Sequence, residues 1–175
     1  DIEVHYSGLP YIRTMTSEKI QRELKLFIYL TLIIASVILL IFFRSFKAVF
    51  FTMIIVLMNV VWVLGVITTL GYEITILTGI LPPLIIVIVV ENSIFLLNKY
   101  HNEYVAHGNK IKALSRVVRR IGNANFLTNA TTAAGFAAFI VTGNKILVEF
   151  GIIASINIIL AYLLTLFLIP IFFSY

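Results

Sequence analysis

Long apolar runs alternate with short polar segments along this chain. Five runs are close to the ~20 apolar residues that an α-helix needs to cross a ~30 Å hydrocarbon layer. They fall at about 26–43, 48–70, 76–98, 124–142 and 150–173. We therefore predict an all-α membrane protein, built as a bundle of five transmembrane helices.

Loop length and proline placement refine this prediction. Residues 44–47 alone separate the first two spans, so these spans are expected to form a tight antiparallel hairpin. Pro82 and Pro83 lie near the start of the third span. Because proline lacks an amide donor, the two prolines either kink this span or begin its regular part.

The N-terminal segment has a different character from the rest of the chain. Residues 2–6 alternate as in a β-strand and a turn signal follows at Gly8-Leu9-Pro10, while residues 14–25 are polar and compatible with a helix. We interpret residues 1–25 as the end of an extracytoplasmic domain with a lead-in helix, and residues 26–175 as the transmembrane domain. The chain is then expected to be an internal piece of a longer protein.

A second amphipathic segment lies between the third and fourth spans, at about 109–121. Its apolar residues recur at helical spacing with basic residues between them. This pattern predicts an interfacial helix on the anionic cytoplasmic leaflet. Such a helix acts either as a strut on the membrane surface or as a specific site for a lipid or a partner.

Composition and charge agree with membrane insertion. Hydrophobic residues make up 61% of the chain and charged residues only 12%, whereas a soluble domain carries about a quarter charged residues. The net charge is +5, and basic residues cluster in the loops at 44–47 and 99–120, which indicates cytoplasmic loops rather than nucleic-acid binding. The N-terminal segment is then extracytoplasmic and the C-terminus cytoplasmic, in a multi-pass membrane protein.

Several chemistries find no support in the sequence. There is no cysteine and no P-loop motif, and no nucleophile–base arrangement is visible. His5, His101 and His107 stand in loops without the spacing of metal ligands. We therefore expect no enzymatic activity, no metal site and no bound cofactor.

Glu91 is the exception to the apolar character of the third span. It lies eight residues before Lys99, and hence about 12 Å deep at 1.5 Å per residue. Placing a carboxylate there costs about 3 kcal/mol, and ionisable residues inside membranes usually mark ion or substrate pathways. Burial in an apolar layer favours the protonated form of the carboxyl group, so Glu91 is a candidate proton carrier.

The fourth span carries a polar line at a matching depth. Thr128, Asn129 and Thr132 share one helix face with Asn125 and Gly135. Asn129 lies nine residues beyond Arg120, at roughly 13–14 Å from the same membrane surface. A hydrogen bond from Thr128 or Asn129 to Glu91 is therefore expected, although ordinary helix packing also accounts for such residues.

Three motifs resemble the MMPL and Patched-like branch of the resistance–nodulation–division (RND) superfamily. Residues 90–100 (VENSIFLLNKY) resemble its fourth transmembrane helix, residues 131–136 (TTAAGF) its fifth, and Glu149-Phe150-Gly151 with Pro170 its sixth. The order and spacing of the three motifs agree with the family over residues 26–173, so the resemblance covers nearly the whole chain. Glu91 stands where the family usually has Asp, and Asn92 where it has Asp or Tyr.

The resemblance implies a two-halved transporter, of which this chain holds helices two to six of one half. It implies export of hydrophobic or amphiphilic compounds, such as drugs and lipids, across a bacterial inner membrane with protons as the coupling ion. Glu91 and Asn92 would form the proton relay, supported by a polar shell of Thr128, Asn129 and Thr132. The expected partners are membrane lipids, the hydrophobic substrate and the second half of the parent chain, with a periplasmic adaptor and a homo-oligomer as further candidates.

Two alternatives remain open at this point. The bundle could be a lipid-sensing or secretion-accessory module of the same superfamily that moves no substrate. Glu91 could instead be a structural residue in a half that has lost its proton site. Transport measured with and without Glu91 distinguishes both from an exporter.

Overall fold

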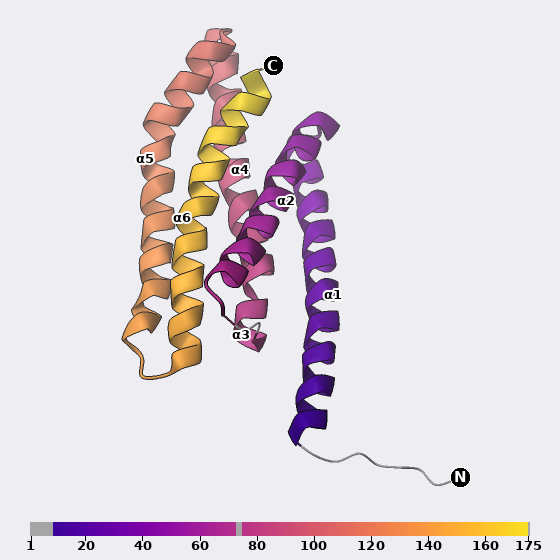
Figure 1. Cartoon of the computed structure of the whole chain (residues 1–175). Coiled ribbons are helices and arrows are strands. Elements are labelled where there is room, and N and C mark those ends of the chain that lie inside the picture. The colour runs from indigo at the N-terminus through magenta and orange to yellow at the C-terminus, as the bar shows by residue number, and fades with distance from the viewer. Residues whose placement is uncertain (1–8, 73–74, 175) are drawn as a thin grey trace, which may run out of the picture.

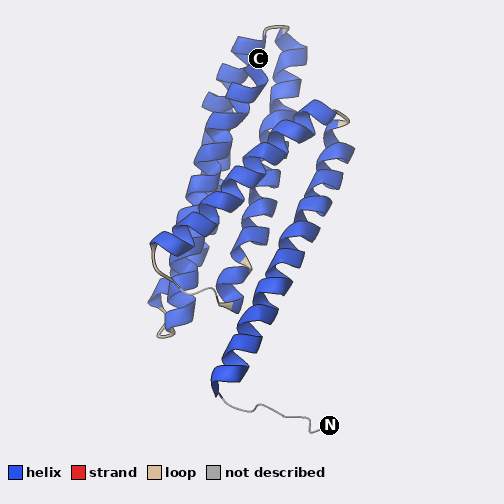
Figure 2. Ribbon diagram, turned by 45° about the vertical axis from the view of Figure 1, so that its right-hand side comes forward, coloured by secondary structure: helices blue, strands red, loops and turns tan. Residues whose placement is uncertain are grey.

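The computed structural model describes residues 9–72 and 75–174, and these are helical apart from short turns (Figures 1 and 2). The elements are α1 (Leu9–Phe43), α2 (Phe46–Thr69), α3 (Ile76–Gly79), α4 (Leu81–His107), α5 (Lys110–Ala137), the 3₁₀ turn η1 (Ala138–Val141) and α6 (Lys145–Ser174). Five helices are long and apolar enough to cross a membrane. The predicted fold class, an all-α membrane bundle, is confirmed.

Local sequence chemistry explains where the helices begin and end. Ser45 caps α2 by accepting from the amide of Ala48, and Thr75 forms a reciprocal capping box with Thr78 at α3. Pro82 and Pro83 stand in the first turn of α4, where amides have no partner within the helix, so they begin this helix rather than kink it. Gly108 ends α4 in the left-handed conformation at φ 65°, which allows the chain to reverse at once into α5.

Helix α4 lies at the centre of the bundle. It contacts α1, α2, α5 and α6, and in Figure 1 α2 and α6 lie in front of it with α1 and α5 on either side. Its most buried residues include Leu81, Ile85, Ile86 and Val89, which are fully inaccessible. Since four helices cover the rest of α4, the exposed residues between 81 and 97 form one open stripe, which consists of Val87, Glu91 and Phe95.

Helix α6 approaches the end of α5 and the η1 turn closely at Gly151. A Cβ atom at Gly151 would lie 2.7 Å from the backbone oxygen of Phe136 and 3.0 Å from Cβ of Phe139. One turn further along α6, the hydroxyl of Ser155 donates to the backbone oxygen of Ala133 (2.9 Å). The motif residues of the fifth and sixth helices therefore pack directly against each other.

Two helices run through the boundaries between predicted segments. The lead-in segment and the first span form one continuous helix, α1, and the amphipathic segment 109–121 continues without a break into the fourth span as α5. The segment 109–121 is thus helical as expected, as the start of α5 rather than an element of its own, and its interfacial position stays a prediction. The strand expected at residues 2–6 lies outside the described residues.

The contact at Gly151 predicts that adding one methyl group there destabilises the bundle. Gly151→Ala should lower the free energy of unfolding by about 1–3 kcal/mol, because the new Cβ meets backbone that cannot move aside cheaply. Gly135→Ala is the matched control, since nothing lies within 4 Å of a Cβ at that position. There, alanine should be neutral or stabilising by up to about 1 kcal/mol. Unfolding of the detergent-solubilised protein in sodium dodecyl sulfate measures both, and equal effects would contradict the packing described.

Candidate intramembrane polar site

A reciprocal amide pair joins α4 to α5 in the middle of their contact. Nδ2 of Asn92 donates to Oδ1 of Asn129 at 3.2 Å, and Nδ2 of Asn129 donates to Oδ1 of Asn92 at 3.0 Å. The two side chains are only 2% and 3% exposed. Because each amide offers one donor and one acceptor to the other, the pair satisfies about half of the hydrogen-bonding capacity of each side chain where water is absent.

Polar groups continue from this pair along α5 toward Gly122. Nδ2 of Asn129 also donates to the backbone oxygen of Asn125 (2.8 Å) and lies 3.3 Å from Oδ1 of that residue. Nδ2 of Asn125 is itself buried and has no hydrogen-bond partner in the described part of the chain. One turn further, the hydroxyl of Tyr162 on α6 donates to the backbone oxygen of Gly122 (2.9 Å). The result is a column of buried polar atoms between α4, α5 and α6.

Glu91 does not belong to this column. It is exposed on the open stripe of α4, and within the described residues it forms no hydrogen bond or ion pair. The predicted hydrogen bond from Asn129 or Thr128 to Glu91 is wrong: Asn129 pairs with Asn92, and the hydroxyl of Thr128 donates to the backbone oxygen of Ala124 (3.3 Å). Glu91 and Asn92 are neighbours on α4, and it is the side chain of Asn92 that faces α5.

Thr128 and Thr132 lie on the same side of the helix contact as Glu91. In antiparallel helices at about 100° per residue, the residues that precede Asn92 and Asn129 emerge on the same side of the pair. Thr128 is accordingly exposed, and the hydroxyl of Thr132 donates back to the oxygen of Thr128 (2.9 Å). The five predicted site residues therefore divide into a buried amide pair and an open face that carries Glu91, Thr128 and Thr132.

Sequence reasoning missed two contributors to the site. No pattern in the sequence distinguishes Tyr162 from the other aromatic residues, although its hydroxyl reaches α5. Asn125 was placed on the polar line but not in the site, and it is the residue whose buried amide lacks a partner. For Asn125 a signal did exist, since it precedes Asn129 by one helical turn.

This arrangement defines a multi-pass membrane protein with an ionisable residue and a buried amide cluster inside its spans. The sequence profile of the MMPL family matches residues 1–175, the whole chain. The chain therefore belongs to the MMPL family, whose members are membrane transporters rather than enzymes.

The chain is also similar to a protein of Methanocaldococcus jannaschii that carries the name "Putative membrane protein MJ1562". The two are 25% identical over 169 residues, which cover 97% of this chain and 44% of that protein. The chain thus spans less than half the length of this relative. No solved structure matches the chain.

The amide pair predicts energetic coupling between α4 and α5. In a double-mutant cycle with Asn92→Leu and Asn129→Leu, we expect a coupling of about 0.6–1.7 kcal/mol, the range of hydrogen bonds inside membranes. The control cycle pairs Asn92→Leu with Asn59→Leu, because the amide of Asn59 donates to its own helix at the oxygen of Ile55 (2.8 Å). Unfolding free energies in mixed micelles check both cycles. Strict additivity in the first cycle would contradict the pair.

Proposed function

We propose that the parent protein exports hydrophobic or amphiphilic compounds across the membrane with the proton gradient as its energy source, and that Glu91 carries the proton. The observation that supports this most is the exposure of Glu91 on the one open stripe of the central helix. An isolated carboxylate facing lipid costs about 3 kcal/mol. Such a residue is retained where protonation and deprotonation are useful.

The amide pair of Asn92 and Asn129 takes up no proton itself, and its role in this proposal is to hold Glu91 in position. The side chains of Asn92 and Asn129 stay neutral over the physiological range of pH, so their mutual hydrogen bonds persist whether Glu91 is charged or not. They hold α4 against α5 at the level of the carboxyl group. In this proposal Asn92 contributes to the relay by fixing the segment of α4 from which Glu91 projects.

The open stripe also indicates where the rest of the transporter packs. The chain covers less than half of the relative that it resembles, so the other part of the parent chain, or a second copy, is available to cover Val87, Glu91 and Phe95. A polar group or a water path on that partner would then reach Glu91. Thr128 and Thr132 would line the same contact from α5.

Energetically, one proton suffices to drive substantial export. A proton that crosses a potential of 100 mV supplies about 2.3 kcal/mol. This corresponds to an accumulation ratio of about 50, since each 1.4 kcal/mol is a factor of ten. The alternative function, a lipid-sensing or secretion-accessory module, has no observation of its own in its favour.

Replacement of Glu91 in the parent protein tests the proposal. Glu91→Gln in proteoliposomes should abolish gradient-driven export, so that the accumulation ratio at 100 mV falls by up to about 50-fold. Glu91→Asp should retain part of the activity, because it keeps a titratable group. Glu103→Gln makes the same chemical change on the same helix, where Glu103 pairs with Arg116 beyond the apolar span, and should leave export unchanged.

Folding and insertion of each variant are checked by its elution as a single species in detergent and by its melting temperature. Export by folded Glu91→Gln at the rate of the unchanged protein would overturn the role of Glu91. Absence of gradient-driven export of any hydrophobic compound from the unchanged protein would overturn the proposed function as a whole.

A further inference from the structure

A groove runs between the first turns of α5 and the last turns of α6. Its volume is about 690 Å³, within the ~300–1,000 Å³ of typical small-molecule pockets. The lining residues are Ile111, Leu114, Ser115, Val118, Arg119, Pro170 and Ile171. Figure 1 shows both helix ends at the same end of the bundle, next to the C-terminus. The proposed proton site does not use this groove.

Aromatic side chains mark the level of this groove in the membrane. Phe172 stacks on Phe51 with ring centroids 5.2 Å apart, and Phe173 lies 6.3 Å from the ring of Tyr100. Aromatic residues gather at the membrane–water interface, where one end of a ring can be wet and the other dry. With the basic loops on the cytoplasmic side, as their charge indicates, the groove opens at the level of the inner-leaflet headgroups.

The groove combines apolar walls with one basic edge. Ile111 and Ile171 are 76% and 55% exposed, which is unfavourable unless an apolar ligand or lipid covers them. Lys112, Ser115 and Arg119 are spaced i, i+3, i+7 and so lie along one edge of α5. No salt bridge in the described part of the chain involves Lys112 or Arg119. Their positive charges are therefore uncompensated.

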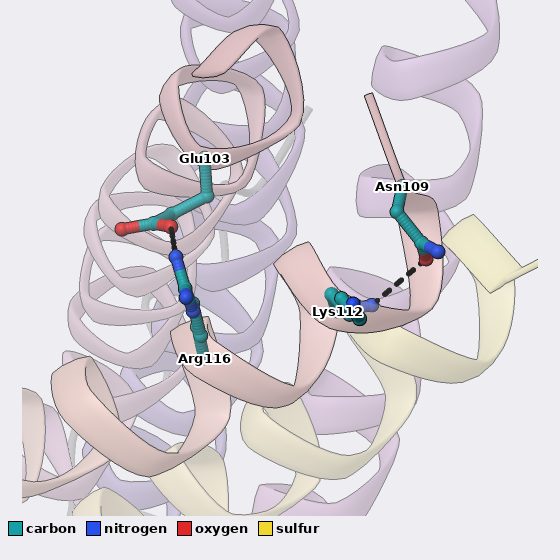
Figure 3. A network of polar contacts seen from close by, with 4 residues as sticks. All are labelled: Glu103, Asn109, Lys112 and Arg116. Atoms are coloured by element: carbon teal, nitrogen blue, oxygen red, sulfur yellow. Dashed lines mark hydrogen bonds and ion pairs between the residues drawn. The ribbon is translucent and has the colours of Figure 1, made fainter. Parts of the chain in front are cut away.

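Arg116, three residues before Arg119, differs from it by forming an ion pair. Nη1 of Arg116 lies 3.5 Å from Oε2 of Glu103, and this ion pair joins the end of α4 to the start of α5, as Figure 3 shows. In the same view, Oδ1 of Asn109 accepts from the backbone amide of Lys112 (3.2 Å) and so caps the start of α5. Arg116 and Arg119 thus carry the same charge three residues apart, one of them paired and the other lining the groove.

We propose that the groove binds an anionic phospholipid of the cytoplasmic leaflet. Arg119 holds the phosphate, because its planar guanidinium can donate two parallel hydrogen bonds to phosphate oxygens. Ser115 and Lys112 lie along the same edge and supply a hydroxyl and a second positive charge. An acyl chain lies against Ile111, Val118 and Ile171. A zwitterionic lipid fits the apolar walls equally well but gains less from the uncompensated charges.

The binding experiment compares two lipids on the full-length protein. Native mass spectrometry in a neutral detergent measures the preference for dioleoyl phosphatidylglycerol over dioleoyl phosphatidylcholine. Arg119→Gln should reduce this preference about fivefold, the effect of removing one basic residue at a membrane surface. Arg116→Gln removes an equal charge outside the groove and should leave the preference within about twofold of its original value.

Two further measurements distinguish a lipid site from a general electrostatic attraction of anionic lipids to the basic surface. Val118→Trp fills the groove and should lower the binding of both lipids, whereas it leaves every basic residue in place. Glycerophosphoglycerol, the headgroup without acyl chains, should fail to compete. Equal effects of Arg119→Gln and Arg116→Gln would overturn the proposal, as would unchanged lipid binding by Val118→Trp. Competition by the headgroup alone would show an anion site instead and would overturn it as well.

Discussion

The absence of water in the hydrocarbon layer is the constraint on which this bundle depends. Helices satisfy the backbone internally, and most hydroxyl side chains follow suit: Thr52, Ser93 and Thr165 each donate to the carbonyl four residues earlier, at 2.7–2.8 Å. Because these hydrogen bonds stay within one helix, they do not determine which helices pack against each other. The few polar contacts that pass between helices therefore have a large influence on how the helices are arranged.

Helix α5 collects these contacts. The pair of Asn92 and Asn129 joins it to α4, while Ser155 and Tyr162 of α6 donate to its backbone at Ala133 and Gly122. Each of these bonds works only in one register, so together they fix the depth and rotation of α5 against both neighbours. Packing alone would leave more freedom, because apolar side chains are nearly interchangeable with lipid tails. Buried polar atoms thus specify this part of the bundle.

Much of the fold could be predicted from the sequence, because hydrophobic run length and turn residues report directly on spans and their ends. Each of the five apolar runs coincides with a helix long and apolar enough to cross a membrane, and the prolines at 82 and 83 begin one of these helices. The helices extend beyond the apolar runs near residues 25 and 122, since a helix can continue through a change of polarity. In the site, the sequence places Glu91 and Asn129 at similar expected depths in the membrane, but it does not show which side chains each of them contacts. A single sequence shows which residues share a face of one helix, not which face meets which neighbour.

The turn at Gly108 and Asn109 gives the long α4–α5 pair a mechanical property. The two helices stay paired up to this turn, and the ion pair of Arg116 with Glu103 joins them near it. The tip of this hairpin lies twenty residues from Asn129, or about 30 Å along α5. A rotation of 10° about the amide pair would thus displace the tip by about 5 Å. A small tilt of the hairpin at the level of the buried asparagines is therefore amplified at its tip.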